Sequence, residues 1–155
     1  MIQVFNSAQK REVEKNLREQ FGIDKIPGTI IKLGSEKLFL YTGEFSGREI
    51  VGIESTVFVE KVGVYFAKLL DGNVKLSIEG SQILGSQIKK NIFELDEEQA
   101  EKWMKGEELN LKSGMRGFVA MKYQNDFLGC GKASEEKISN FVPKIRRLKN
   151  RAAGV

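Results

Sequence analysis

Histidine is missing from this chain of 155 residues, and cysteine occurs only once, as Cys130. Without histidine there are no Ser-His or Cys-His nucleophile pairs, no histidine general base and no histidine ligand for zinc. A single cysteine excludes an internal disulfide and an all-cysteine zinc site, and it predicts a reducing, cytoplasmic location. No motif for a metal or a cofactor is present, and we expect neither. Catalysis by carboxylates or lysine stays open.

Long apolar runs are also absent. None approaches the roughly 20 residues of a membrane-spanning helix, and the first residues lack the basic-then-apolar order of a signal peptide. With 41% hydrophobic and 30% charged residues, the composition is typical of a soluble globular protein with no membrane partner.

Positive charge is concentrated near the C-terminus. Residues 1–110 hold 15 Lys+Arg and 18 Asp+Glu, a net of −3, whereas residues 111–155 hold 10 basic and 3 acidic residues, a net of +7. Such clustering focuses an electrostatic field that suits a polyanion, although a solvated basic tail has the same composition.

The N-terminal half has a mixed pattern. Residues 7–22 predict a helix capped by Ser7, and Thr29–Leu33 with Leu38–Tyr41 predicts a hairpin. Residues 43–52 have the composition of a loop. Residues 55–71 fit either a helix or a strand, and the apolar stripe favours the helix.

Beyond these elements, alternating Val74, Leu76 and Ile78 predict a half-buried strand. A polar, glycine-bearing stretch at residues 80–91 predicts a boundary between two halves that pack together.

The C-terminal half has clearer signals for where its helix and strands begin and end. A short strand at residues 91–95 precedes a helix in which Asp96 and Gln99 form a capping box and Gly106 supplies the left-handed end. Phe118–Tyr123 and Phe127–Ala133 predict a hairpin, and residues 137–142 predict a short strand that stops at Pro143. Several short strands with one capped helix predict a small, partly closed β-barrel.

Three features that resemble sites are better explained as structure. The "GCGK" stretch at residues 129–132 lies inside a predicted strand, and so lacks the strand–turn–helix context of a phosphate loop. Cys130 has no histidine to activate it and is expected to be a buried, inert thiol. Trp103 lies on the apolar helix face and is expected in the core.

Two basic groups are candidate nucleic-acid contacts. The glycine-rich stretch 104–117 carries Lys105, Lys112 and Arg116, and its backbone can approach a sugar–phosphate chain closely. The second group is Lys144, Arg146, Arg147, Lys149 and Arg151. Because Pro143 fixes a bend, we expect its first members to be held against the barrel. Five phosphate contacts would give a log–log salt slope of roughly −3.5 to −4.5.

Three ordered motifs in residues 90–148 resemble a known family. "LDEEQAEKWMKGEELNL", "GFVAMKYQNDFLGCGK" and "KISNFVPKIRR" are similar to the C-terminal PUA-like region of the Sun-type RNA cytosine-5 methyltransferases, which archaea also carry as stand-alone proteins. The resemblance implies a small β-barrel that binds structured RNA. Two positions depart from the family: Cys130 replaces a frequent tryptophan, and Ser139–Asn140 replaces Lys-Asn.

The resemblance implies an α+β fold, with a small N-terminal α/β segment similar to a pre-PUA domain packed on a PUA-like β-barrel. We expect domains at 1–88 and 89–155. The expected RNA-contacting residues are Lys105, Gly106, Lys112, Arg116, Lys132, Asn140, Lys144, Arg146 and Arg147.

The family's chemistry needs a cofactor-binding sheet and paired cysteines, so the resemblance implies RNA binding without catalysis. We expect a non-enzymatic protein that acts on rRNA or tRNA in ribosome biogenesis or RNA modification. A separate RNA methyltransferase or a ribosome-assembly protein is a candidate partner. Two alternatives stay open: a protein-interaction adaptor with weak polyanion affinity, and a carboxylate-based RNA-processing enzyme.

Overall fold

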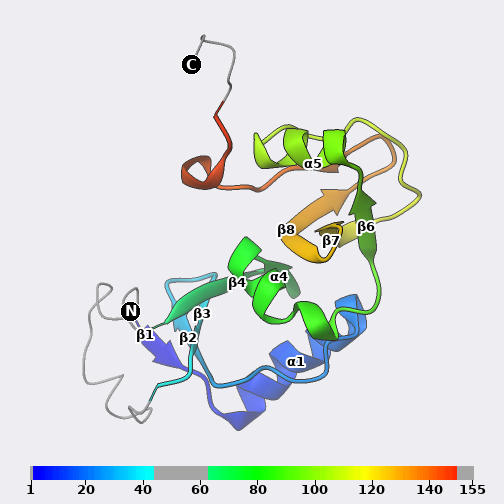
Figure 1. The fold of residues 1–155 in the computed structure, drawn as a ribbon. Coiled ribbons are helices and arrows are strands. Elements are labelled where there is room, and N and C mark those ends of the chain that lie inside the picture. Colours follow the sequence, from blue (N-terminus) through cyan, green and yellow to red (C-terminus); the bar gives the residue numbers. More distant parts are fainter. Residues whose placement is uncertain (1, 44–62, 150–155) are drawn as a thin grey trace.

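The computed structural model describes residues 2–43 and 63–149, and within them the chain forms two sheets (Figure 1). The first sheet is antiparallel and has five strands in chain order. The second has four strands in chain order, with β6 parallel to β7 and the later pairs antiparallel. Their bounds are β1 Ile2–Val4, β2 Thr29–Leu33, β3 Lys37–Tyr41, β4 Val64–Leu70, β5 Asn73–Leu76, β6 Ile92–Leu95, β7 Gly117–Tyr123, β8 Asp126–Ala133 and β9 Ile138–Ser139.

One short helix, α4 (Ile78–Ile83), joins the two sheets. It contacts β4 on one side and β8 on the other, and Figure 1 shows it between them. Gly80 makes the close approach possible, since a Cβ there would overlap the Phe66 carbonyl. The Ser81 hydroxyl accepts a hydrogen bond from the Gly129 backbone N–H at 2.9 Å. Helix α4 therefore packs against both halves of the protein.

Helix α1 (Ser7–Phe21) begins and ends with regular caps. The residue that caps it is Asn6, one position before the predicted Ser7, and its side chain forms a capping box with Gln9. Gly22 ends the helix with a φ of 76°, in the left-handed region that glycine adopts without steric cost. The apolar spacing of i, i+4 and i+8 places Val13, Leu17 and Phe21 in the core.

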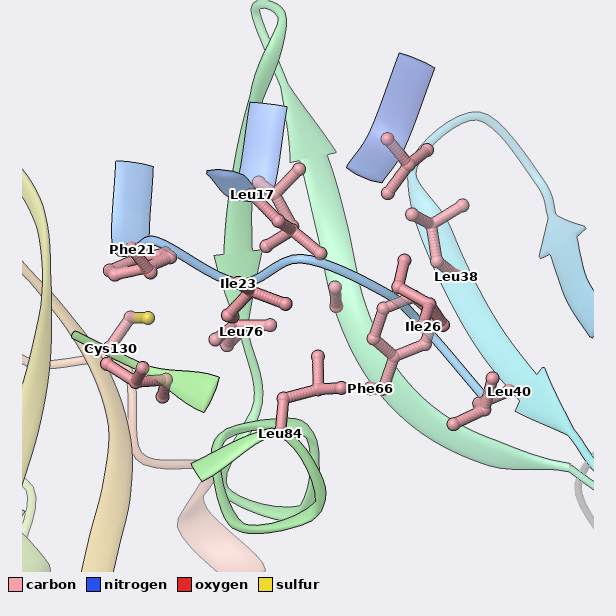
Figure 2. Close-up of a cluster of buried hydrophobic side chains, with 14 of the residues drawn as sticks. Leu17, Phe21, Ile23, Ile26, Leu38, Leu40, Phe66, Leu76, Leu84 and Cys130 are labelled. Atoms are coloured by element: carbon pink, nitrogen blue, oxygen red, sulfur yellow. The ribbon is translucent and has the colours of Figure 1, made fainter. Parts of the chain in front are cut away.

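The largest buried cluster lies between α1, the first sheet and β8 (Figure 2). Leu17 and Phe21 from α1 meet Phe66 of β4, and Ala120 and Cys130 of the second sheet belong to the same cluster. The core therefore crosses the predicted boundary, as expected for halves that pack together. The division into domains at 1–88 and 89–155 stays a prediction.

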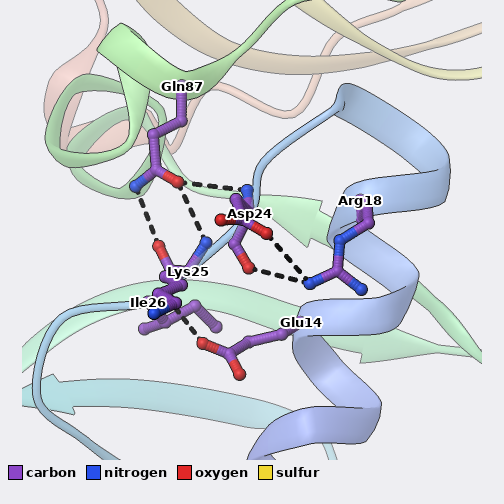
Figure 3. A network of polar contacts seen from close by, with 6 residues as sticks. All are labelled: Glu14, Arg18, Asp24, Lys25, Ile26 and Gln87. Atoms are coloured by element: carbon purple, nitrogen blue, oxygen red, sulfur yellow. Dashed lines mark hydrogen bonds and ion pairs between the residues drawn. The ribbon is translucent and has the colours of Figure 1, made fainter.

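The segment between α1 and β2 is held by side chains rather than by regular structure (Figure 3). Gln87, at the end of the short 3-10 helix η1 (Gly85–Gln87), accepts from the backbone N–H groups of Asp24 and Lys25 and donates to the Lys25 carbonyl. Glu14 accepts from the Ile26 N–H at 2.9 Å. These bonds satisfy backbone groups that no strand would pair.

The helix predicted over residues 55–71 is wrong where the structure describes it, because Val64–Leu70 forms strand β4. Residues 55–62, and nearly all of the loop predicted at 43–52, lie outside the described residues. A register shift at Leu38/Phe39 lets the consecutive residues Phe66 and Ala67 both enter the core. Adjacent buried residues break strand alternation and imitate a helical stripe.

The segment after β5 is also more ordered than predicted. Val74 and Leu76 are buried as the alternation predicted, but the strand ends at Leu76, and Ile78 begins α4. Ser77 causes the change, since its hydroxyl accepts from the Gly80 N–H and caps the helix. The stretch predicted as a polar boundary therefore contains α4 and η1.

The C-terminal elements follow the sequence closely. Helix α5 (Glu97–Met104) has the capping box of Asp96 and Gln99, and Gly106 has a φ of 88°. The hairpin of β7 and β8 is present, whereas the strand predicted at residues 137–142 is limited to Ile138–Ser139 of β9. Together they form a curled, half-barrel sheet consistent with a PUA-like domain.

Candidate nucleic-acid interface

Two of the predicted cations, Arg116 and Lys132, lie at one end of the β7–β8 hairpin. Lys132 is the register partner of Phe118, and its Nζ lies 5.8 Å from the centroid of that ring. Arg116 precedes β7 and is exposed. Both line a hollow of about 600 Å³ with Phe118 and Phe141. Cations beside aromatic rings form a surface that binds both the phosphates and the bases of a nucleic acid.

Phe141 is the centre of this surface. It is 38% exposed, which is unusual for a phenylalanine, and its ring packs edge-on against Phe118 at 6.4 Å between centroids. The same hollow is also lined by Glu19 and Asp71 from the N-terminal half. Its charge is therefore mixed, and the basic side is the one formed by β7 and β8.

The basic segment that follows Pro143, residues 144–149, is called the basic exit, and it is held against the domain, as expected. It begins with the 3-10 helix η2 (Lys144–Arg146), and the Leu148 N–H donates to the Met104 carbonyl at 2.7 Å. Lys144 is exposed, and Arg146 forms an ion pair with Glu79 of α4. Lys149 is exposed beyond this anchor, and Arg151 lies outside the described residues.

Arg147 is positioned by two contacts. Its Nε donates to the Val142 carbonyl at 3.0 Å, and its side chain covers Gly106, where a Cβ would overlap the guanidinium. Gly106 therefore has a structural reason to be glycine in addition to its positive φ. The contact between Gly106 and Arg147 brings the loop after α5 and the basic exit together.

Asn140 is engaged inside the protein. Its Nδ2 donates to the carbonyls of Trp103 and Glu107, at 2.8 and 3.0 Å, and its Oδ1 accepts from the Val142 N–H at 2.7 Å. Both amide hydrogens are used, so the side chain fixes the path of the chain. Its predicted RNA contact stays a prediction.

The two remaining loop lysines, Lys105 and Lys112, each lie beside a carboxylate. Lys105 pairs with Glu101 at 3.1 Å, and Lys112 lies 3.9 Å from Glu136. Exposed pairs of this kind contribute little to stability and leave the cation available to a polyanion. The structure therefore joins Arg116 with Lys132, and Gly106 with Arg147, and leaves Lys112 apart from both.

Cys130 and Trp103 have the structural roles that the sequence predicted. Burial raises the pKa of the Cys130 thiol to about 12, so it stays protonated near neutral pH. Trp103 is fully buried, and its indole N–H donates to the Leu128 carbonyl at 2.9 Å.

Three lysines that the sequence analysis did not select form a second basic group. Lys37, Lys68 and Lys75 lie on β3, β4 and β5 and line a cleft of about 450 Å³ that is also lined by Phe141. Burial first, and the neighbouring Lys68 second, lower the pKa of Lys75. Strand register would have revealed this group, but β4 was predicted as a helix.

Within residues 2–43 and 63–149, no cluster of three or more acidic or cysteine side chains could hold a metal ion. None of the helices in these ranges has the length and apolar character needed to cross a bilayer.

Comparison with known proteins supports the family resemblance. Residues 90–148 match the family model described as the methyltransferase RsmF PUA domain. The ribosomal RNA small subunit methyltransferases F of two Vibrio vulnificus strains are each 22% identical to the chain over 143 residues. That alignment covers 90% of this chain and 29% of each relative, so the chain spans less than a third of their length. The similarity of residues 90–148 to the PUA domain of a Sun-type rRNA methyltransferase, predicted from three motifs, is thereby confirmed.

Proposed function

We propose that this chain is a non-catalytic RNA-binding protein that acts on structured rRNA or tRNA in ribosome biogenesis or RNA modification. The observation that carries the proposal is the match of residues 90–148 to an rRNA methyltransferase PUA domain. The basic C-terminal residues, the half-buried ring of Phe118 and the exposed ring of Phe141 lie within that same segment.

Phosphate contacts supply most of the affinity in this mechanism. Arg116, Lys132 and Lys144 are exposed, and no acidic side chain of the described residues lies within ion-pair distance of them. Arg146 can exchange its exposed pairing with Glu79 for a phosphate at small cost. Specificity comes from the shape of the RNA rather than from its linear sequence.

In this proposed function, the chain itself catalyses no reaction. The only cysteine is buried and protonated, and the relatives that carry a methyltransferase name extend far beyond the aligned region. A separate RNA methyltransferase would use this protein as a targeting subunit, with the PUA-like surface selecting the RNA.

The test compares two triple variants with the same change in net charge. In the first, Arg116→Ala, Lys132→Ala and Lys144→Ala remove the proposed contacts. In the control, Lys15→Ala, Lys102→Ala and Lys137→Ala remove cations elsewhere, two of them paired with Glu98 and Glu108. Fluorescence anisotropy with a labelled rRNA stem-loop and a tRNA transcript measures affinity.

We expect the first variant alone to lose at least about tenfold in affinity, and its log–log salt slope to become shallower by about 2 to 3. Equal affinities for both variants would contradict the mechanism. Unchanged RNA affinity, together with retained capture of a protein partner, would favour the adaptor function instead.

A further inference from the structure

The first sheet carries three lysines directly opposite one another. Lys37 is the register partner of Lys68, and Lys68 is the register partner of Lys75. Partners across neighbouring strands share a face of the sheet, so the three form a continuous row, the lysine row. Like charges in this arrangement repel one another and destabilise the sheet.

No carboxylate among the described residues offsets that repulsion with an ion pair to the row. Glu36 is near enough to favour the charged form of Lys75, but desolvation and Lys68 outweigh it. Cations that destabilise the sheet and have no carboxylate partner are typical of a site that binds an external anion.

The lysine row lines a cleft, with Lys37 exposed and Lys68 and Lys75 half-buried. The cleft has a volume of about 450 Å³, and Gly129, Phe141 and Pro143 also line it. Glu79 lines it too, with its carboxylate paired with Arg146. This volume lies in the range of ordinary ligand sites. Lys75 Nζ lies 4.2 Å from the centroid of the Phe141 ring, so the row extends to the aromatic surface.

The spread of the row favours a chain of phosphates over a single ion. Neighbouring strands are about 4.8 Å apart, so three strands spread the lysines over about 10 Å. A single phosphate ion would have to draw three mutually repelling side chains together, whereas successive phosphates of one strand can contact them while they stay apart. Phe141 lines both this cleft and the hollow that holds Arg116 and Lys132. A strand leaving the cleft therefore meets the surface described above.

We propose that this cleft binds a single-stranded RNA segment, with its phosphates on Lys37, Lys68 and Lys75 and a base against Phe141. The inference rests on the proposed RNA-binding function and names a second part of that site. It gives the N-terminal half a direct role in binding. The RNA it predicts is a structured element with an unpaired tail.

The experiment uses two labelled RNAs, a blunt stem-loop and the same stem-loop with a single-stranded tail. The test variant combines Lys37→Gln, Lys68→Gln and Lys75→Gln, and the control combines Lys15→Gln, Lys25→Gln and Lys90→Gln, none of which lines the cleft. Anisotropy is measured over a salt series. Thermal unfolding of the test variant checks the fold and is expected at the wild-type temperature or above, because repulsion is removed.

We expect the wild-type protein and the control to prefer the tailed RNA. The test variant should lose that preference. Its affinity for the tailed RNA should fall about tenfold, and its log–log salt slope with that RNA should become shallower by about 2. Its affinity for the blunt stem-loop should equal that of the wild-type protein. Wild-type affinity of the test variant for the tailed RNA would overturn the inference. Failure of the wild-type protein to bind either RNA would instead overturn the proposed function.

Two further measurements keep the result unambiguous. Phe141→Ala, which leaves the row intact, should reduce quenching of a 2-aminopurine in the tail, and unchanged quenching would refute the stacking contact. Competition with inorganic phosphate distinguishes a site for an RNA strand from a site for a free phosphate ion. Displacement of the tailed RNA by phosphate, beyond the effect of matched ionic strength, would show a phosphate-ion site and overturn the RNA assignment.

Discussion

Replacing Gly106 with alanine is expected to destabilise the fold by about 2–3 kcal/mol. Its φ of 88° lies in the left-handed region, where an L residue costs about 1–2 kcal/mol. A Cβ there would also displace Arg147, whose Nε donates to the Val142 carbonyl. Losing a hydrogen bond from a charged donor costs about 1.5 kcal/mol, and restriction of the unfolded chain by alanine returns about 0.5 kcal/mol.

Gly114 supplies the matched control for this prediction. Its φ is 76°, and a Cβ there would meet nothing within 4 Å. Gly114→Ala should therefore cost only the backbone strain, about 1.5 kcal/mol less than Gly106→Ala. In an Arg147→Ala background, the cost of Gly106→Ala should fall to that of the control.

Urea unfolding followed by the fluorescence of Trp103, the only tryptophan, measures the wild-type protein, the three single variants and the double variant. Equal costs for Gly106→Ala and Gly114→Ala, or a strictly additive cycle with Arg147→Ala, would refute the reasoning. Either result would mean that the loop after α5 and the basic exit are not coupled as the geometry requires.

Two further predictions concern α5 and the core. Asp96→Ala removes the capping box and should cost about 1 kcal/mol in urea unfolding, whereas the neighbouring Glu97→Ala should cost less; equal losses would contradict the cap. Cys130 should not react with a thiol reagent in the folded protein. Its pKa is raised from 9.0 to about 12, so the contribution of this thiol to stability should be constant below pH 9 and become destabilising as pH rises toward 12, because only the unfolded thiol ionises. Cys130→Ala should remove that contribution, and an unchanged pH profile would contradict the burial.

Local signals in the sequence were sufficient for much of the fold. The stripe of Val13, Leu17 and Phe21 and the capping box of Asp96 and Gln99 each act within one element, and both helices form where these signals predicted them. The β7–β8 hairpin also forms over the predicted residues, because its turn and its alternation are local.

Features that depend on distant pairing could not be predicted. Strand β4 is fixed by its partners β3 and β5, and its bulge gave it a helical pattern. The lysine row depends on the same register, so a sequence pattern that predicts a helix for β4 cannot reveal it. The internal bonds of Asn140 and the pairing of Arg146 with Glu79 join residues far apart in the sequence. For these residues, the sequence shows that an amide or a charged group is present, but it does not show which group it contacts.

The salt dependence of RNA binding by the unmodified protein is the most direct measurement. With a blunt rRNA stem-loop, contacts from Arg116, Lys132, Lys144, Arg146 and Arg147 predict a log–log slope of about −3.5 to −4.5. A slope near zero, or no binding at low salt, would mean that these cations do not contact phosphate and would contradict the assignment of this surface to RNA.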